Sequence, residues 1–312
     1  MDNPKVSIII PVFNGENFIE NCLNSVANQT YRNFEVLIIN DGSTDSSLST
    51  IEKWISENAS LVNVQVFSTA NSGVSSARNT GIQKSKGGYI AFLDCDDYWE
   101  NGKLDAQVRI LEADHNCVGA ITNFFLVKNL RNGELRAFRL IKHQNIESLR
   151  FGWFSLLGNG GLISSSLIYR KNLNLRFSNE LSTSADLDFF LNLSFAGKVQ
   201  IVGEPLVNYR IHGSQMHLSS VKLIHDYELL AKRLSSYDVQ ISKTALMGNA
   251  LAMSALLEFS RRNFITGFSL IKKSFNTNYG SIFSILVSVI WKRVHSKLNF
   301  ISWSLKNSQG KY

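Results

Sequence analysis

The first hundred residues predict an α/β protein with a mostly parallel central sheet flanked by helices. One observation is a set of continuous β-branched runs such as KVSIIIPV at 5–12, typical of parallel strands covered on both faces. The other is that stretches with apolar residues at helical spacing, such as 16–29, alternate with these runs. Strand–helix–strand repetition indicates parallel strands joined by right-handed crossovers.

Each expected element follows from its local pattern. FEVLIIN at 34–40 is a second buried strand, and VNVQVF at 62–67 alternates as a strand does. The stretch 43–57 begins with cap-forming residues, as a helix does. The expected elements are, in order, strand 5–12, helix 16–29, strand 34–40, helix 43–57, strand 62–67, helix 73–85 and strand 88–94.

The regular alternation weakens after residue 100. An Asn132-Gly133 turn between apolar runs at 120–127 and 136–141 predicts an antiparallel hairpin. A strand is expected at 161–170, and a helix at 184–197 that Gly197 ends. The chain then looks wholly helical, so we expect a catalytic domain at 1–218 and a basic helical extension at 219–312.

The net charge of +7 is concentrated in the last part of the chain. Residues 1–220 hold 19 Lys and Arg against 21 Asp and Glu, whereas residues 221–312 hold 13 against 4. A basic extension on a near-neutral body indicates an anionic partner such as phospholipid, phosphate or nucleic acid. Of these we expect peripheral contact with an anionic membrane and no nucleic acid. The basic residues Lys272, Lys273, Lys292, Arg293 and Lys297 bracket an apolar run at 281–291. The alternative is a helix packed on the catalytic domain with a solvated basic face.

Cysteine usage and hydropathy predict a cytoplasmic protein. Cys22, Cys95 and Cys117 form neither a disulfide framework nor a zinc pattern, which favours a reducing compartment. The N-terminus does not read as a signal peptide. The run at 281–291 has eleven residues, and a membrane span needs about 20. No span is predicted, so the expected location is the cytoplasm, including the inner face of the membrane.

Polar residues follow each of the four expected strands. They are Phe13-Asn14, Asp41-Gly42-Ser43, the stretch from Asn71 to Arg78, and the acidic group from Asp94 to Asp97. Because ligands of open α/β sheets bind at the carboxyl ends of the strands, these loops predict one site.

The acidic group in YIAFLDCDDYW at 89–99 indicates a cation. Two carboxylates about 4 Å apart repel by roughly 4 kcal/mol at an effective dielectric near 20, and Mg²⁺ or Mn²⁺ shared with substrate phosphates would relieve this. The alternative is a capped turn with solvated acids. Three classes of phosphate-handling enzyme have a strand that ends in such an acidic motif. A haloacid-dehalogenase-type phosphatase requires a hydroxyl or small residue at the position of Tyr98, and a sugar-nucleotide pyrophosphorylase requires a Gly-rich basic loop, whereas PVFNGEN at 11–17 has one Gly and no Lys or Arg. The third class is the nucleotide-sugar glycosyltransferases.

The sequence resembles family 2 glycosyltransferases of the GT-A fold over roughly residues 5–215. The opening VSIIIPVFNGENFIENCLNSVANQTYRNFEVLIINDGSTDSS is similar to the family pattern PVYNxxxxLxxxLxSlxxQ followed by E[IV]xVxDDGSxD. NSGVSSARNTGI at 71–82 matches NxGxxxARNxG, and YIAFLDCDDYW matches FLDxDD. YRIHGSQMH at 209–217 resembles the late YRxH element.

The resemblance implies a set of donor-binding residues. Phe13 would stack on the nucleobase, unless it is a core aromatic; Asp41 would accept from the N3–H of uracil or thymine, unless it caps the next helix. Arg78 would reach the base or diphosphate, its alternative being a surface ion pair, and Asp94 would contact the ribose or the water shell of the metal. Pro11, Val12 and Cys95 lie in the same motifs and are assigned to the donor site with them, Cys95 as a small side chain turned toward the packed face.

The resemblance also implies the metal ligands and the catalytic base. Asp96 would bind Mg²⁺ or Mn²⁺ on the diphosphate, and His212 would complete that site, its alternative being a structural role. The family keeps its base in an acidic pair at a helix start. Here Ala185 precedes Asp186, so we assign the base to Asp186 and keep Asp188 in reserve. Positions 186 and 188 point to different faces of a helix, so only one should enter the site.

The implied activity is metal-dependent inverting transfer of one sugar from a UDP- or dTDP-linked donor. The expected acceptor is a hydroxyl of a saccharide or polyprenyl-linked saccharide in cell-surface polysaccharide synthesis. Asp97 and Trp99 are expected to shape the acceptor side. A processive synthase would show membrane helices and a QxxRW motif, and neither is present. The other hypothesis is a degenerate nucleotide-sugar-binding protein without turnover, which Ala185 and Phe13 motivate.

Overall fold

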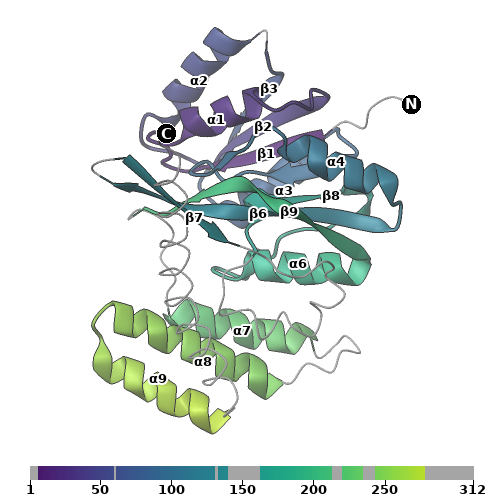
Figure 1. Ribbon diagram of the computed structural model, residues 1–312. Helices are drawn as coiled ribbons and strands as arrows, with labels where there is room; N and C mark the ends of the chain where they lie inside the picture. The colour runs from purple at the N-terminus through teal and green to yellow at the C-terminus, as the bar shows by residue number, and fades with distance from the viewer. Residues whose placement is uncertain are drawn as a thin grey trace, which may run out of the picture. The chain divides into compact units, whose positions relative to one another are not determined.

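The computed structural model describes residues 6–59, 61–130, 133–139, 162–212, 220–234 and 243–277 (Figure 1). The chain divides into two compact units. Among the described residues, those up to 212 belong to the first unit and those from 220 to the second.

The first unit contains the alternating strands and helices that the sequence predicts. Its elements are β1 (Val6–Val12), α1 (Ile19–Ala27), β2 (Phe34–Asn40), α2 (Ser47–Asn58), β3 (Val64–Ser68), α3 (Val74–Lys84), β4 (Tyr89–Phe92), β5 (Tyr98–Trp99), α4 (Lys103–Ala113), β6 (Cys117–Leu130), β7 (Gly133–Arg139), β8 (Leu167–Arg170), α6 (Ala185–Ala196) and β9 (Lys198–Arg210). Short 3-10 turns at Ser164–Ser166 and Lys171–Leu173 flank β8.

One sheet runs through this unit in the order β3-β2-β1-β4-β8-β6-β9-β5, and β7 pairs with β6. The strands β1 to β4 are parallel to one another, as expected. β8 then runs antiparallel to both β4 and β6. β6 and β7 form the expected antiparallel hairpin, but Gly133, expected in the turn, is the first residue of β7 and pairs with Leu130. The carboxyl ends of β1, β2 and β4 therefore meet at one edge, where the sequence predicts the site.

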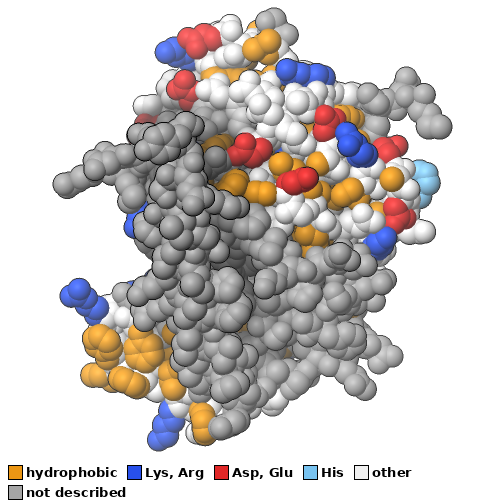
Figure 2. Space-filling model, viewed as in Figure 1, with side chains coloured by type: hydrophobic (Ala, Val, Ile, Leu, Met, Phe, Trp, Pro, Cys, Tyr) orange, Lys and Arg blue, Asp and Glu red, His pale blue; other side chains and the backbone are white. Residues whose placement is uncertain are grey.

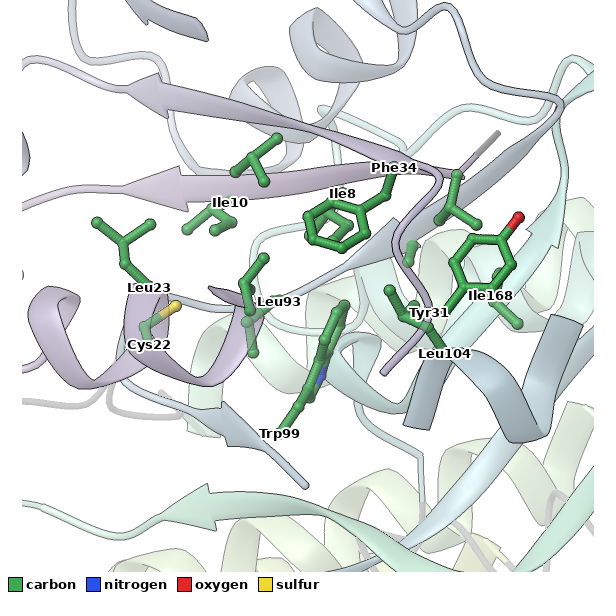
Figure 3. Packing of buried hydrophobic residues seen from close by; sticks show 14 of the residues in the cluster. Ile8, Ile10, Cys22, Leu23, Tyr31, Phe34, Leu93, Trp99, Leu104 and Ile168 are labelled. Carbon is green, nitrogen blue, oxygen red and sulfur yellow. The ribbon is translucent and has the colours of Figure 1, made fainter. Parts of the chain in front are cut away.

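Apolar side chains alternate between the two faces of β1 and build a core on each. Ile8 and Ile10 pack with α1 and α4 side chains such as Leu23 and Leu104 in a cluster that also holds Trp99 (Figure 3). On the opposite face, a Cβ on Gly81 of α3 would lie 2.4 Å from Ile9 Cγ2, so α3 reaches β1 only because residue 81 is glycine. The continuous β-branched run of β1 thus reflects burial on both sides.

Three elements of this unit were not among the expected ones. α4 carries a modest apolar face, and β5 has only two residues. β9 is a long strand that pairs in parallel with β6 and antiparallel with β5. Its pairing with β6 shifts register around Asn123, opposite Pro205, because proline has no amide hydrogen to donate.

A buried lysine in α4 yields a prediction about pH. The side chain of Lys103 is fully buried, with Nζ 4.0 Å from the Trp99 ring centre and 2.7 Å from Gln107 Oε1. Burial lowers the pKa of Lys103 well below its ordinary value. Between that lowered pKa and about 10.4 the unfolded chain binds more protons than the folded chain, so the free energy of unfolding rises with pH in this window.

We expect Lys103→Met to remove this rise in the free energy of unfolding, while the exposed control Lys86→Met keeps it. Urea unfolding at pH 7 and pH 9 measures the rise in both variants. Equal slopes in Lys103→Met and the wild type would contradict the prediction.

The second unit is helical in its described part. α7 (Ser220–Leu234), α8 (Lys243–Ser260) and α9 (Phe264–Thr277) pack around Leu251, Ala255 and Leu270. No helix in the described part of the chain is both long and apolar enough to cross a membrane. The apolar run 281–291 and the basic residues Lys292, Arg293 and Lys297 lie outside the described residues.

Candidate functional site

The loops after β1 and β2 are joined by hydrogen bonds between side chains and backbone. Asn14, at a left-handed φ of 52°, donates its N–H to Ser43 Oγ (3.1 Å), and its Oδ1 accepts the N–H of Thr44 (2.8 Å). One residue on, the N–H of Gly15 donates to Ser47 Oγ (2.8 Å). The serines and threonine of the DGSTDSS stretch thus fix the loop that carries Phe13.

Phe13 lies at the open edge of the sheet rather than in the core. Its side chain is 51% exposed, whereas Pro11 and Val12 are buried within β1. The core-aromatic alternative for Phe13 is therefore wrong, and its ring is available as a stacking surface. Pro11 and Val12 directly precede it in β1, and the Val12 carbonyl accepts the N–H of Asp41 (2.8 Å).

Asp41 holds the start of α3. Its Oδ1 accepts the N–H of Ser72 and its Oδ2 accepts the N–H of Gly73, each at 2.8 Å. Gly73 has a φ of 90° and immediately precedes α3, so the carboxylate orders the turn into that helix. The alternative role for Asp41 was to cap the next helix along the chain, α2. In the structure its carboxylate instead contacts the residues that precede α3. Asp41 is 3% exposed.

Arg78 bridges two carboxylates that are far apart in the sequence. From α3 its Nη2 lies 2.7 Å from Asp94 Oδ1, after β4, and its Nη1 lies 2.6 Å from Asp186 Oδ1, on α6. The guanidinium also lies over the ring of Phe177, 4.9 Å from its centre. Because Arg78 is 3% exposed, this is a buried bridge rather than the surface ion pair considered from the sequence.

The electrostatics of the bridge follow from its burial and its charges. Burial opposes the charged form of Arg78, but the carboxylates of Asp186 and then Asp94 outweigh it and raise the pKa of the guanidinium. Burial also raises the pKa of Asp94, and Arg78 offsets this only in part. Three charged groups therefore depend on one another at the edge of the sheet.

Asp186 and Asp188 face different surroundings at the start of α6, as expected. The Asp186 side chain is 35% exposed, whereas Asp188 is 6% exposed. Phe189, further along α6, stacks on Phe177 with ring centres 4.3 Å apart, which anchors α6 next to Arg78. The contact with Arg78 is made by Asp186 Oδ1, and about a third of the Asp186 side chain stays exposed.

Asp96 forms a second polar pair, with His212. His212 Nε2 lies 3.0 Å from Asp96 Oδ2, and their side chains are 17% and 24% exposed. The Asp96 carbonyl accepts a hydrogen bond from Arg210 Nε (3.0 Å). This meeting follows from the pairing of β5 with β9, in which Tyr98 lies opposite Asn208, so Asp96 comes alongside residues 210–212.

Two aromatic rings near this pair were not expected from the sequence. The Phe18 ring lies 4.4 Å from the His212 ring between centres, and 5.5 Å from the Arg210 guanidinium. The Tyr98 ring lies 5.1 Å from the same guanidinium. A guanidinium held against two ring faces suits the cation–π geometry of arginine. The YRIH string was the only signal for Arg210, and nothing in the sequence marked Phe18.

The expectation that Asp97 and Trp99 shape the acceptor side is wrong. Asp97 is 1% exposed; its Oδ2 accepts from the Ser165 hydroxyl (2.6 Å) and its Oδ1 from the N–H of Arg210 (3.1 Å). Trp99 is 2% exposed and donates Nε1–H to the Ser165 carbonyl (2.8 Å). Both residues support the site from within the fold, because alternate residues of this extended stretch turn inward.

Cys95 packs against the apolar cluster, as expected for a small side chain turned inward. A Cβ on Gly15 would lie 2.9 Å from its sulfur, so the loop after β1 rests directly on it. Burial raises the pKa of the Cys95 thiol, with smaller contributions from its acidic neighbours. The thiol is therefore protonated at neutral pH and serves packing.

The donor set of Asp96 and His212 fits a divalent ion that shares its shell with a substrate. Within the described ranges, no group of three or more His, Cys, Asp or Glu side chains gathers where it could hold a metal. The pair supplies one carboxylate and one imidazole, and Mg²⁺ or Mn²⁺ commonly takes its remaining oxygens from phosphates and water. A diphosphate would complete such a shell.

Comparisons with known proteins agree with this architecture. The model of Glycosyl transferase family 2 matches residues 7–171, more than half of the 312 residues. A Haemophilus influenzae protein described as an uncharacterized glycosyltransferase is 34% identical over 62% of this chain and 72% of its own length. Chondroitin synthase of Pasteurella multocida is 28% identical over 75% of this chain, which spans 24% of the synthase.

Solved structures show the same fold. S. aureus TarS 1–349 in complex with UDP-GlcNAc superposes with a TM-score of 0.60 at 21% identity, over 90% of this chain and 81% of that one. Mannosyltransferase PcManGT from Pyrobaculum calidifontis, in complex with GDP-Man and Mn²⁺, gives 0.56 at 16% identity, over 97% and 84%. At these identities the likeness concerns the fold alone. Because the family model covers the strands and loops that hold Phe13, Asp41, Arg78 and Asp96, the chain belongs to glycosyl transferase family 2 and has the GT-A fold.

Proposed function

We propose that the chain is a metal-dependent inverting glycosyltransferase that moves one sugar from a UDP- or dTDP-sugar to a hydroxyl of a saccharide acceptor. The observation that carries this proposal is the Asp94–Arg78–Asp186 bridge beside the Asp96–His212 pair. Both groups lie at the edge of a sheet where open α/β proteins bind ligands, which supports a role of Asp186 as base and of Asp96 and His212 as metal ligands.

The donor would bind across the ends of β1, β2 and β4. The exposed face of Phe13 offers a stacking surface for the nucleobase. Asp41, at the end of β2, would accept a hydrogen bond from N3–H of the base. Its two oxygens would use lone pairs that are not taken by the N–H groups of Ser72 and Gly73. Asp94 would contact the ribose. The UDP-GlcNAc bound in the related fold of TarS supports a uridine nucleotide.

The chemistry would be a single displacement at the anomeric carbon. The acceptor oxygen forms the new bond, the bond from the anomeric carbon to the phosphate oxygen breaks, and the nucleoside diphosphate leaves. Asp186 takes the acceptor proton at Oδ2 while Arg78 holds Oδ1 in place. Asp96 and His212 would hold Mg²⁺ or Mn²⁺, which supplies stabilisation of negative charge on the departing diphosphate. The Mn²⁺ complex of PcManGT supports this choice of ion.

The acceptor is proposed to be a saccharide or a polyprenyl-linked saccharide of a cell-surface polysaccharide. The likeness to chondroitin synthase supports a polysaccharide product. The basic extension at 219–312 supports work at the inner face of the membrane, where a lipid-linked acceptor would be held. The catalytic role falls to residues 1–218 in this proposal, and residues 219–312 form the basic extension.

Thermal unfolding with a panel of nucleotide sugars, each with and without Mn²⁺, tests the proposed site. We expect a UDP- or dTDP-sugar with Mn²⁺ to raise Tm, because a ligand at 100 times its Kd adds about 2.7 kcal/mol to the free energy of unfolding. Asp96→Ala should abolish the increment that depends on the metal, while the distant control Glu57→Gln keeps it.

The outcomes separate the two hypotheses for this family member. Donor binding that is equal with and without metal would contradict the proposed ligand role of Asp96. Metal-dependent donor binding with neither hydrolysis nor transfer on any acceptor would favour the binding protein without turnover. Donor hydrolysis that Asp96→Ala removes would exclude it.

A further inference from the structure

The outer side of α9 is apolar and exposed. Phe264, Ile265, Phe268 and Phe275 are 56%, 87%, 66% and 50% exposed. In Figure 2 orange side chains gather at the lower left, where Figure 1 draws α8 and α9. Because residues on a helix turn by about 100° each, positions 264, 268 and 275 fall within roughly 40° of one another, with 265 at the border.

The inner side of the same helix is already occupied. Gly267, Leu270 and Ser274 are buried. A Cβ on Gly267 would lie 2.4 Å from the Phe259 ring, and Ser274 Oγ donates to the Gly248 carbonyl (2.7 Å). α9 therefore packs on α8 through this side. Phe264 and Phe268 also touch the edge of that contact, with ring centres 6.3 Å and 5.1 Å from that of Phe259, but more than half of each side chain stays exposed.

Positive charge surrounds this outward face. The sequence from Arg261 to Thr277 contains four Lys and Arg and no Asp or Glu. Lys272 and Lys273 are exposed near its middle and Arg262 at its start. Glu258 of α8 offsets part of this charge, since its Oε1 lies 3.8 Å from Arg261 Nη1.

We infer that the outer face of α9, made by Phe264, Ile265, Phe268, Lys272 and Phe275, docks on an anionic phospholipid surface. Aromatic and aliphatic side chains flanked by lysine on a helix that does not span the bilayer suit burial at the headgroup level. The positive charge favours a lipid surface over a second copy of the chain. A second copy would bring the same cations against this face, whereas anionic headgroups neutralise them. This inference deepens the membrane location in the proposed function and does not depend on which donor or acceptor is used.

Flotation of the full chain with phosphatidylcholine vesicles, with and without phosphatidylglycerol, tests the inference. We expect binding only to the anionic vesicles, weakened by added salt. The variant Ile265→Gln/Phe268→Gln should lower binding by roughly tenfold or more, and Lys272→Gln/Lys273→Gln by a similar factor. The matched control is Val221→Gln on α7, because Val221 is also apolar and 75% exposed.

Each outcome decides the matter. Retained binding in both double variants, or equal binding to neutral vesicles, would overturn the inference. So would loss of a dimer, seen by light scattering without lipid, in Ile265→Gln/Phe268→Gln. Far-ultraviolet circular dichroism checks that the variants fold. Transfer to a soluble acceptor in detergent-free buffer should be unchanged in these variants, so failure of docking and failure of the proposed transfer are told apart.

Discussion

Replacing Asp186 by asparagine is expected to lower kcat by roughly 10²- to 10⁴-fold, the usual contribution of a general base. The asparagine oxygen can still accept the hydrogen bond that Arg78 Nη1 gives to Oδ1 (2.6 Å), so the position of the side chain should be kept. What is lost is the carboxylate oxygen that would receive the proton of the acceptor. Donor binding, measured by the shift in Tm, should stay within a factor of a few of the wild type.

The control for this experiment is Glu57→Gln, which makes the same change of charge on an exposed carboxylate of α2. Initial rates with a saturating donor and a series of acceptors give kcat for both variants. If Asp186→Asn kept most of the wild-type kcat, the base would have to be sought elsewhere, with Asp188 the first alternative. A loss of donor binding in the variant would instead point to a role of Asp186 in holding the nucleotide sugar.

Replacing Arg78 by methionine is expected to lower the free energy of unfolding by about 3–5 kcal/mol. This is the usual cost of removing one partner from a buried ion pair, since the remaining charges lose their compensation. The charged form of Asp94 would be destabilised most, because burial already raises the pKa of Asp94 and Arg78 is the group that opposes this shift. The Phe177 ring would also lose the guanidinium that lies over it.

Urea unfolding of Arg78→Met against the exposed control Arg32→Met measures this effect. The double variant Arg78→Met/Asp94→Asn should recover part of the stability, because it removes the uncompensated carboxylate together with its partner. A loss below 1 kcal/mol in the single variant, or no recovery in the double variant, would show that the bridge is not a stabilising unit.

The sequence predicts the half of the fold in which each strand and helix has a clear local pattern. β1 to β4 and the helices between them have uninterrupted apolar patterns, and each strand pairs with another of these four. The resemblance to the family then places Phe13, Asp41, Arg78 and Asp94 at one edge, where the structure also has them. The site roles of these residues remain proposals.

The parts that depend on distant pairing were not predictable in the same way. β9 joins two apolar segments across Gly203, Glu204 and Pro205, so neither segment alone reads as one long strand. Its pairing with β5 spans more than a hundred residues and yet fixes where Arg210 and His212 lie. The bridge from Arg78 to Asp186 is also long-range, and no local pattern indicates that one guanidinium serves two carboxylates.

Asp96 and Asp97 are consecutive residues whose side chains point in opposite directions. Asp96 faces His212 at the open edge, and Asp97 is turned inward to Ser165 and the Arg210 backbone. The turn from Asp94 to Asp97, closed by the hydrogen bond from the Asp97 N–H to the Asp94 carbonyl (3.0 Å), sets these two directions, so a change in the number of residues between Leu93 and Tyr98 is expected to disturb both contacts. Both the number of residues in this turn and the size of residue 95 are therefore constrained, because the loop after β1 rests on the Cys95 sulfur, 2.9 Å from where a Cβ on Gly15 would lie.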